Sequence, residues 1–205
     1  MATNTDHENG VLAPRSSTLD RRAFFLGAVS LLTVSGQARA QGKKRTFVLE
    51  ERFLPQMVAA AYDYLAGTIV VVPRARYLYL VAGAGFARRY GIGVGKAGLA
   101  FSGSAVIGRK AKWPPWRPTN NMIRRDPKKY ARYADGVPGG PNNPLGSRAL
   151  YLYREGRDTL YRIHGTTEPW TIGKAVSNGC IRMVNEHVED LYERVPVGAQ
   201  VVVVA

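Results

Sequence analysis

Two side chains that could form a catalytic pair lie sixteen positions apart in the stretch Ile163 to Met183. Cys180 is the only cysteine of the 205-residue chain, and His164 is one of its three histidines. A thiol becomes a strong nucleophile once it loses its proton, and an imidazole titrates close enough to neutrality to take that proton. The residue types therefore predict a cysteine nucleophile with a histidine base. The alternative is a buried structural thiol beside an unrelated histidine.

The N-terminal residues have the order of an export signal. Arg21 and Arg22 precede the apolar run Ala23 to Val34, which is too short and too diluted by small polar residues to span a bilayer. Ala38 and Ala40 then give the small-x-small pattern of a cleavage site. We predict a twin-arginine-type signal peptide at 1–40, a periplasmic mature protein and no transmembrane anchor after cleavage. An amphipathic segment that stays attached is the alternative.

The predicted export affects how the single cysteine is interpreted. In an oxidising compartment structural cysteines are usually paired, and a lone thiol cannot form an internal bridge. Cys180 is therefore expected to be reactive and to be labelled rapidly by a thiol reagent at neutral pH.

Composition indicates a folded, basic protein. The chain is 45% hydrophobic and 21% charged, with a formal net charge of +14. Such a surface attracts polyanions, including a bacterial cell wall. The cations are mostly scattered and no nucleic-acid-binding motif is present, so a nucleic acid partner is not predicted. We also predict no metal or cofactor.

The mature chain reads as mostly β. An irregular, weakly helical lead-in is expected at 41–66, and a long Pro-rich loop at 112–148 whose Trp113 and Trp116 are candidates for a lid. β-branched and aromatic residues predict strands near 68–72, 76–81, 87–94, 104–107, 149–153, 159–164 and 201–204. His164 would then lie at the end of a strand, at a rim of the fold.

One helix is clear in the sequence, at about 185–195. Asn185 is a suitable N-cap, and Val188, Leu191 and Val195 fall at helical spacing on one face. Pro196 ends the pattern. His187 is expected to be exposed on this helix.

Residues Gly67 to Val204 resemble the catalytic domain of the YkuD-type L,D-transpeptidases, enzymes that cross-link peptidoglycan. The resemblance is densest where I-H-G-T is followed by S-N-G-C-I-R-M, within Tyr161 to Met183. It implies a sandwich- or barrel-like, mostly β catalytic domain at 67–205. It also implies peptidoglycan stem peptides as substrates in the periplasm.

The resemblance also assigns roles. Cys180 would attack the stem tetrapeptide, expel D-alanine and form a thioester, with His164 as the base. The Gly165 carbonyl would orient the imidazole, and the backbone N–H groups of Gly179 and Cys180 would form the oxyanion hole. An amine in the cell wall would then take the acyl group.

Five further positions are expected to contact substrate: Ser177, Asn178, Arg182, Trp170 and Tyr161. Asn178 departs from the family, which mostly has histidine there. For Arg182, gripping a carboxylate and forming an ion pair with the nearby helix acids are alternatives. For Trp170 and Tyr161 the alternative is core packing.

Other activities remain open at this level. Water instead of an amine would make a carboxypeptidase or a cross-link hydrolase, and an outer-membrane protein or lipoprotein could be the acceptor. A papain-like protease has its cysteine before its histidine, the reverse of the order here. A basic wall-binding module with an inert thiol is the non-enzymatic alternative.

Overall fold

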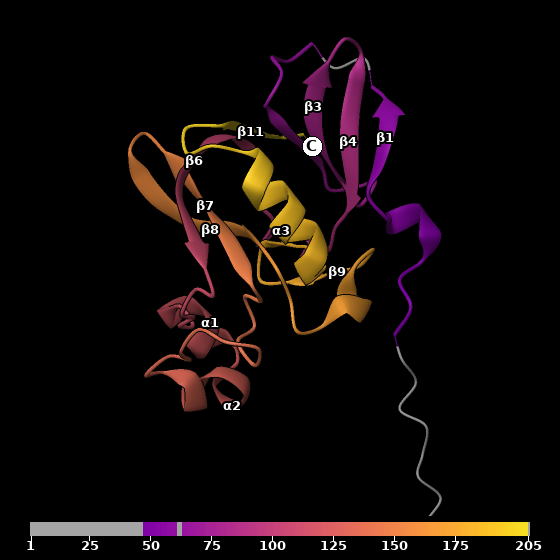
Figure 1. Ribbon diagram of the computed structural model, residues 1–205. Helices are drawn as coiled ribbons and strands as arrows, with labels where there is room; N and C mark the ends of the chain where they lie inside the picture. Colours follow the sequence, from indigo (N-terminus) through magenta and orange to yellow (C-terminus); the bar gives the residue numbers. More distant parts are fainter. Residues whose placement is uncertain (1–46, 61–62, 205) are drawn as a thin grey trace, which may run out of the picture. The chain divides into compact units, whose positions relative to one another are not determined.

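The computed structural model describes residues 47–60 and 63–204, which belong to one unit, Lys44–Ala205 (Figure 1). The predicted signal peptide at 1–40 lies outside the described residues. No helix in the described part of the chain is long and apolar enough to cross a lipid bilayer.

Nine strands form one sheet, which confirms the mostly β prediction. The strand order is β1-β4-β3-β2-β11-β6-β7-β8-β10. The strands are β1 (Gln56–Ala59), β2 (Ile69–Val72), β3 (Tyr77–Gly83), β4 (Phe86–Gly91), β6 (Gly103–Lys112), β7 (Arg148–Arg154), β8 (Arg157–His164), β10 (Ile181–Arg182) and β11 (Gln200–Val203). A second, two-stranded sheet pairs β5 (Val94–Gly95) with β9 (Ala175–Ser177).

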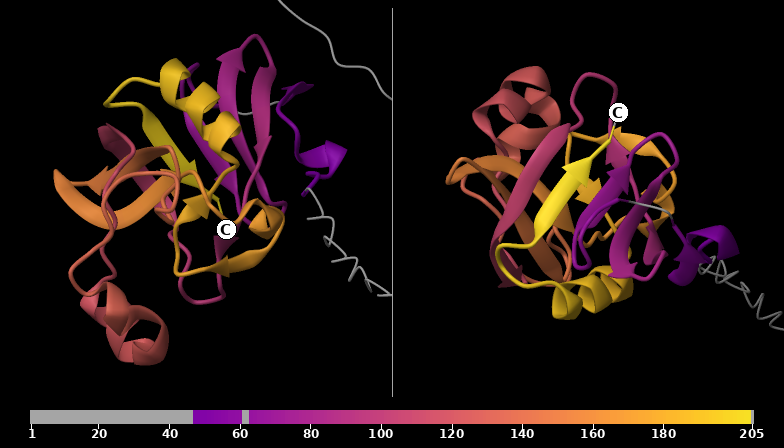
Figure 2. Two further views of the ribbon diagram at one scale, coloured as in Figure 1. Left: turned by 60° about the horizontal axis from the view of Figure 1, so that its bottom comes forward. Right: turned by 90° about the horizontal axis from the view of Figure 1, so that it is seen from above.

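The C-terminal strand joins the two halves of the large sheet. β11 pairs in parallel with β2 on one side and antiparallel with β6 on the other. The predicted hairpin of β2 and β3 is present, with Val70 opposite Tyr79. Strands from both halves contribute to one core, whose fully buried members include Ile69, Leu78 and Leu150. The sheet curves around this core in both views of Figure 2.

The predicted helix is confirmed as α3 (Asn185–Arg194), which packs on β7 and β8. Its buried face includes Val188 and Leu191, as the spacing predicts. Two details of the prediction are wrong. The N-cap residue is Val184, and Asn185 is the first helical residue with its side chain used elsewhere. His187 is buried, because its face of the helix turns toward the sheet.

Two expected irregular segments contain regular structure. Within 41–66 the described residues form a 3-10 helix, Glu51–Phe53, and strand β1, which pairs with β4. Within 112–148 they form α1 (Asn120–Arg125), α2 (Pro127–Tyr130) and a 3-10 helix, Ala131–Tyr133. A further 3-10 turn is Pro169–Thr171.

Side-chain caps explain the helices in the Pro-rich segment. Thr119 accepts a hydrogen bond from the Met122 N–H at 3.2 Å, and Asp126 accepts one from Lys129 at 3.1 Å. Caps of this kind satisfy N–H groups that a helix cannot satisfy itself. Pro127 occupies the first position of α2, where its missing N–H costs nothing.

Candidate active site

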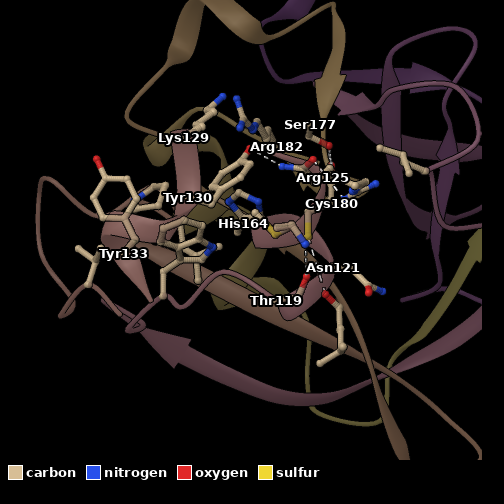
Figure 3. A pocket seen from close by; sticks show the side chains of 18 of the residues that line it. Thr119, Asn121, Arg125, Lys129, Tyr130, Tyr133, His164, Ser177, Cys180 and Arg182 are labelled. Atoms are coloured by element: carbon tan, nitrogen blue, oxygen red, sulfur yellow. Dashed lines mark hydrogen bonds between the residues drawn. The ribbon is translucent and has the colours of Figure 1, made fainter. Parts of the chain in front are cut away.

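A short parallel strand pair brings the cysteine and the histidine together. β10 pairs with β8 so that Arg182 lies opposite His164 and Ile181 opposite Ile163. The Met183 N–H donates to the His164 carbonyl at 2.8 Å and continues this pairing. Cys180 comes directly before β10, and His164 is the last residue of β8. The pairing of these two strands therefore brings together two residues that are sixteen positions apart in the sequence. His164 and Cys180 line the same pocket (Figure 3).

His164 ends β8, as predicted, but its side chain is buried rather than at a rim. The residue is 4% exposed. The imidazole Nδ1 donates to the Gly165 carbonyl at 2.5 Å, the orienting contact that the resemblance implied. Burial, together with the nearby positive charge of Arg182, lowers the pKa of His164 to about 3, although the hydrogen bond to the Gly165 carbonyl opposes this shift. The ring is therefore neutral at pH 7 and able to accept a proton on its other nitrogen.

A single amide side chain holds the loop that follows His164. Asn185 Oδ1 accepts hydrogen bonds from the Thr166 N–H at 3.1 Å and the Ser147 N–H at 3.2 Å. A β-carbon placed at Gly165 or at Gly146 would lie 2.2 Å from the same oxygen. Glycine at both positions is what allows this oxygen to approach the two backbone segments.

Replacing Asn185 with alanine is expected to lower the free energy of unfolding by about 2 kcal/mol, because two backbone N–H groups in a buried region lose their acceptor. Urea denaturation of the two proteins measures this difference. Glu186→Ala, at the exposed next position of α3, is the matched control and should change stability by less than about 0.5 kcal/mol. Equal stabilities for Asn185→Ala and the parent would contradict the role of the Asn185 side chain in holding the two backbone segments.

The loop Ser177 to Cys180 is held by its own serine. Ser177 Oγ donates to the Cys180 carbonyl at 2.6 Å and accepts from the Gly179 N–H at 3.1 Å. Ser177 is 2% exposed and organises the loop. It also lines the pocket, and its predicted contact with substrate stays a prediction. The Gly179 N–H, one of the two predicted oxyanion donors, already has an acceptor in Ser177 Oγ.

Gly179 is constrained by its surroundings. Its φ is +126°, a conformation that favours glycine, and an added β-carbon would lie 2.5 Å from both the Leu99 carbonyl oxygen and the ring of Tyr161. The residue before Cys180 must therefore be glycine for the loop to lie against these groups.

The thiol of Cys180 faces the chain that precedes the histidine. Its Sγ lies 4.0 Å from the Leu160 carbonyl oxygen, and no hydrogen bond joins it to the imidazole among the described residues. Leu160 has φ of +64° and donates its N–H to Asp158 Oδ1 at 2.8 Å. Arg162 in turn forms an ion pair with Asp158 at 2.7 Å. This turn directs the Leu160 carbonyl toward the thiol.

Burial raises the pKa of the Cys180 thiol, and the backbone N–H and positive charge of Arg162, together with Arg182, oppose the rise without cancelling it. Both shifts at the site thus favour the neutral pair, a protonated thiol and an uncharged imidazole.

The structure changes the sequence-based expectation of rapid labelling. Alkylation of Cys180 by iodoacetamide at pH 7 is expected to be slower than that of free cysteine, because the raised pKa reduces the thiolate fraction. The rate should still be rising above pH 9. Intact-protein mass spectrometry between pH 6 and pH 10 measures it, with free cysteine under the same conditions as the control. A plateau with a midpoint below pH 8 would contradict this expectation.

The pocket around the pair has a volume of about 800 Å³. One wall comes from the segment between β6 and β7, where the Trp116 ring lies 5.8 Å from that of Tyr133 and 6.4 Å from that of Tyr130. Trp116 thus lines the pocket, whereas Trp113 is 45% exposed and is not among the lining residues. Their predicted role as a lid stays a prediction.

Two further aromatic predictions have different outcomes. Tyr161 both packs and lines the pocket: its ring lies 5.1 Å from that of Phe101 and its hydroxyl donates to the Leu99 carbonyl at 3.2 Å. Trp170 is 50% exposed and lies outside the residues that line the pocket, so neither predicted alternative applies to it. It belongs to a 3-10 turn that presents its ring to solvent.

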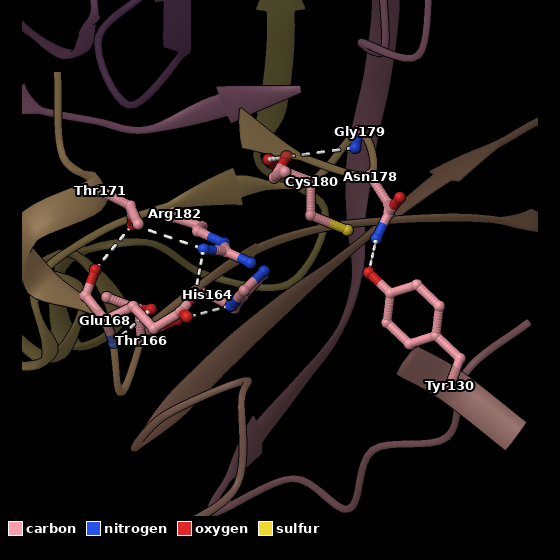
Figure 4. A network of polar contacts seen from close by, with 11 residues as sticks. Tyr130, His164, Thr166, Glu168, Thr171, Asn178, Gly179, Cys180 and Arg182 are labelled. Carbon is pink, nitrogen blue, oxygen red and sulfur yellow. Dashed lines mark hydrogen bonds and ion pairs between the residues drawn. The ribbon is translucent and has the colours of Figure 1, made fainter. Parts of the chain in front are cut away.

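Arg182 lines the pocket and forms an ion pair, but not with the acids of α3. Its Nη1 lies 2.7 Å from Glu168 Oε2 and 3.4 Å from Thr171 Oγ1 (Figure 4). Glu168 follows β8, so the pair joins the segments that carry the histidine and the cysteine. Sequence spacing could not reveal this partner, because Glu168 becomes a neighbour only through the pairing of β8 and β10.

Asn178 connects the cysteine loop to the Pro-rich segment. Its Nδ2 donates to the Tyr130 hydroxyl at 2.7 Å, and its Oδ1 lies 3.5 Å from Arg125 Nη2. In Figure 4, His164 and Arg182 lie on one side of the thiol and the Asn178–Tyr130 pair on the other. Tyr130 and Arg125 are site residues that sequence reasoning missed; the length and aromatic content of the segment were the only signals.

Comparison with known proteins agrees with this geometry. The chain is 36% identical over 153 residues to the probable L,D-transpeptidase ErfK/SrfK of Salmonella typhimurium and 35% identical over 153 residues to that of Escherichia coli. Each match covers 74% of this chain and 48% of the relative, so the chain spans about half the length of the curated relatives it matches.

A crystal structure from Brucella melitensis, described as a probable carnitine operon oxidoreductase caia, is also similar. It is 55% identical, with a TM-score of 0.52. The match covers 76% of this chain and 96% of that one.

Fold and site together define a mostly β domain in which a histidine at the end of one strand and a cysteine just before the adjacent strand line one pocket. The model of the L,D-transpeptidase catalytic domain, YkuD, matches residues 66–203. The chain belongs to this family, and the resemblance inferred from its motifs is confirmed. At this level the prediction of an enzyme domain is confirmed as well.

Proposed function

We propose that the protein is a peptidoglycan L,D-transpeptidase that works through a thioester on Cys180. The observation that carries the proposal is the parallel pairing of β8 and β10, which places His164 and Cys180 in one pocket with the imidazole held by the Gly165 carbonyl. A nucleophile, a neutral base and a fixed orienting acceptor are the parts that acyl transfer needs.

In the acylation half, His164 takes the thiol proton as Sγ attacks the carbonyl of the third stem residue. The Cys180 side chain must first turn away from the Leu160 carbonyl. The Cys180 N–H stabilises the oxyanion of the tetrahedral intermediate. When the intermediate collapses, the carbon–nitrogen bond to D-alanine breaks, the imidazolium returns its proton to the departing amine, and the thioester remains.

In the transfer half, an amine of the cell wall attacks the thioester and His164 takes a proton from it. A new amide forms, the carbon–sulfur bond breaks, and the proton returns to the thiolate. Wall-attached proteins and water are the other acceptors that this chemistry allows, and water would give a tripeptide product.

Incubation of the protein with a disaccharide tetrapeptide tests the proposal. Mass spectrometry should show free D-alanine and cross-linked dimers joined between third residues. Tripeptide without dimers would replace the transferase by a carboxypeptidase, and no change in the substrate would overturn the enzymatic proposal.

We also propose that residues 1–40 are a twin-arginine-type signal and that the catalytic domain, at 67–205, works in the periplasm. The Arg21-Arg22 pair, the apolar run and the alanine cleavage pattern support this proposal. A reporter active only in the periplasm should lose activity when both arginines become lysine. Unchanged export would remove the twin-arginine route.

A further inference from the structure

The charges of the pocket are unbalanced. Five of its lining residues are cations, and one is a carboxylate, Glu168. Arg182 already neutralises Glu168 through their ion pair. The remaining cations all come from the segment of α1, α2 and the 3-10 turn that follows: Arg124, Arg125, Lys129 and Arg132.

These four cations have no carboxylate partner among the described residues. Lys129 and Arg132 lie over the rings of the tyrosines next to them, at 5.4 Å and 4.7 Å from the ring centres. Arg125 reaches only an amide oxygen, that of Asn178, at 3.5 Å. Cations held near aromatic and amide groups keep their capacity to bind an anion.

The unpaired cations occupy a defined side of the thiol. Arg125 Nη2 lies 3.5 Å from Oδ1 of Asn178, which precedes Cys180 by two residues. Figure 4 shows Asn178 on the side of the thiol away from His164. Arg125 and Lys129, from the helical segment, are both among the residues that line the pocket (Figure 3). A substrate bound across Cys180 therefore meets neutralised charge around Arg182 and free positive charge around Arg125 and Lys129.

We propose that Arg125 and Lys129 form a carboxylate subsite, which selects peptides with a free carboxylate next to the reacting centre over the same peptides with a carboxamide there. The inference rests on the proposed function, because it concerns peptides that reach Cys180. A carboxamide is uncharged and presents N–H donors on one side, so it loses the attraction to both cations and offers them a poorer acceptor.

The test compares a tetrapeptide muropeptide that carries free carboxylates with its amidated counterpart. The free form should have a kcat/KM roughly tenfold higher, and 0.5 M NaCl should reduce this preference because the subsite opens to solvent. Arg125→Gln combined with Lys129→Gln should bring the ratio to within about twofold by lowering turnover of the free form. Lys128→Gln, a neighbouring exposed cation outside the pocket lining, should retain the preference.

Two arms separate donor from acceptor. With one peptide at a time, thioester formation on Cys180, followed by intact mass, reports the donor; with a fixed donor and amidated or free acceptors, dimer yield reports the acceptor. A preference in either arm that the double substitution removes supports the subsite and names its occupant. Equal rates for both forms in both arms, or a preference that survives the double substitution, overturn it.

Binding separates this inference from the proposed function. Calorimetry with the Cys180→Ala protein needs no turnover, and it should show tighter binding of the free peptide by roughly tenfold. Tighter binding of the free peptide without turnover by the parent protein would remove the proposed function and keep the subsite. Turnover with no preference in rate or affinity would keep the proposed function and overturn the subsite.

Discussion

Replacing Cys180 with alanine is expected to abolish D-alanine release and dimer formation, with a loss on the order of 10⁴-fold or more. The substitution removes the atom that forms the thioester, and what remains of the site can only bind and polarise the substrate. The residue is partly exposed at the pocket and its neighbours are held by Ser177, so the fold should persist. Product formation is measured by chromatography of muropeptide digests.

Two controls make this result specific to the thiol. The free energy of unfolding of the Cys180→Ala protein should lie within about 0.5 kcal/mol of that of the parent, which excludes loss of structure as the cause. It should also fail to gain the mass of a carbapenem adduct that the parent protein acquires. An adduct of equal stoichiometry on the alanine protein would show that another residue is the nucleophile.

Replacing His164 with glutamine is expected to lower kcat/KM by roughly 10² to 10⁴-fold, the range that a general base contributes. The amide has a similar size and can still donate to the Gly165 carbonyl, but it cannot take a proton from the thiol. Steady-state kinetics with the tetrapeptide substrate measure the loss. Activity within threefold of the parent would remove His164 from the mechanism.

The same substitution has an effect on acid stability that tests the buried, neutral state of the ring. Histidine in the unfolded chain titrates near pH 6.5, whereas the folded pKa of His164 is about 3. Below pH 6.5 the unfolded state therefore binds a proton that the folded state refuses, and the free energy of unfolding falls. Between pH 7 and pH 5 this contribution amounts to about 2 kcal/mol, and it should be absent in His164→Gln.

His187→Gln is the matched control for this measurement. Burial also lowers the pKa of His187, so its loss should likewise reduce the acid dependence of stability. It is not among the residues that line the pocket, and kcat/KM should stay within about twofold of the parent. An acid dependence that is unchanged in His164→Gln would show that the ring is protonated in the folded protein at these pH values.

Local patterns in the sequence predicted much of the fold. The β-branched runs predicted β2 and β3, and the spacing of Val188 and Leu191 predicted α3. The helices of the Pro-rich segment were missed because their caps, Thr119 and Asp126, stand among prolines and cations with little apolar periodicity. A helix stabilised by its caps leaves no hydrophobic pattern to read.

The central pair of the site was predicted from residue types, and its surroundings were not. Asn185 has the identity of an N-cap, yet it serves two backbone N–H groups from segments nineteen and thirty-eight positions away. The ion pair of Arg182 with Glu168 spans 14 positions of the sequence, and the hydrogen bond of Asn178 with Tyr130 spans 48. Such contacts depend on strand register and loop path, which single-sequence patterns do not contain.

The junction around Asn185 Oδ1 limits which residues positions 146 and 165 can carry. A β-carbon at either position would lie 2.2 Å from that oxygen. At position 146 it would also lie 2.5 Å from the Thr166 nitrogen, and the φ of +64° there favours glycine. A smaller side chain at position 185 therefore removes the closest contact at position 165, whereas position 146 still requires glycine.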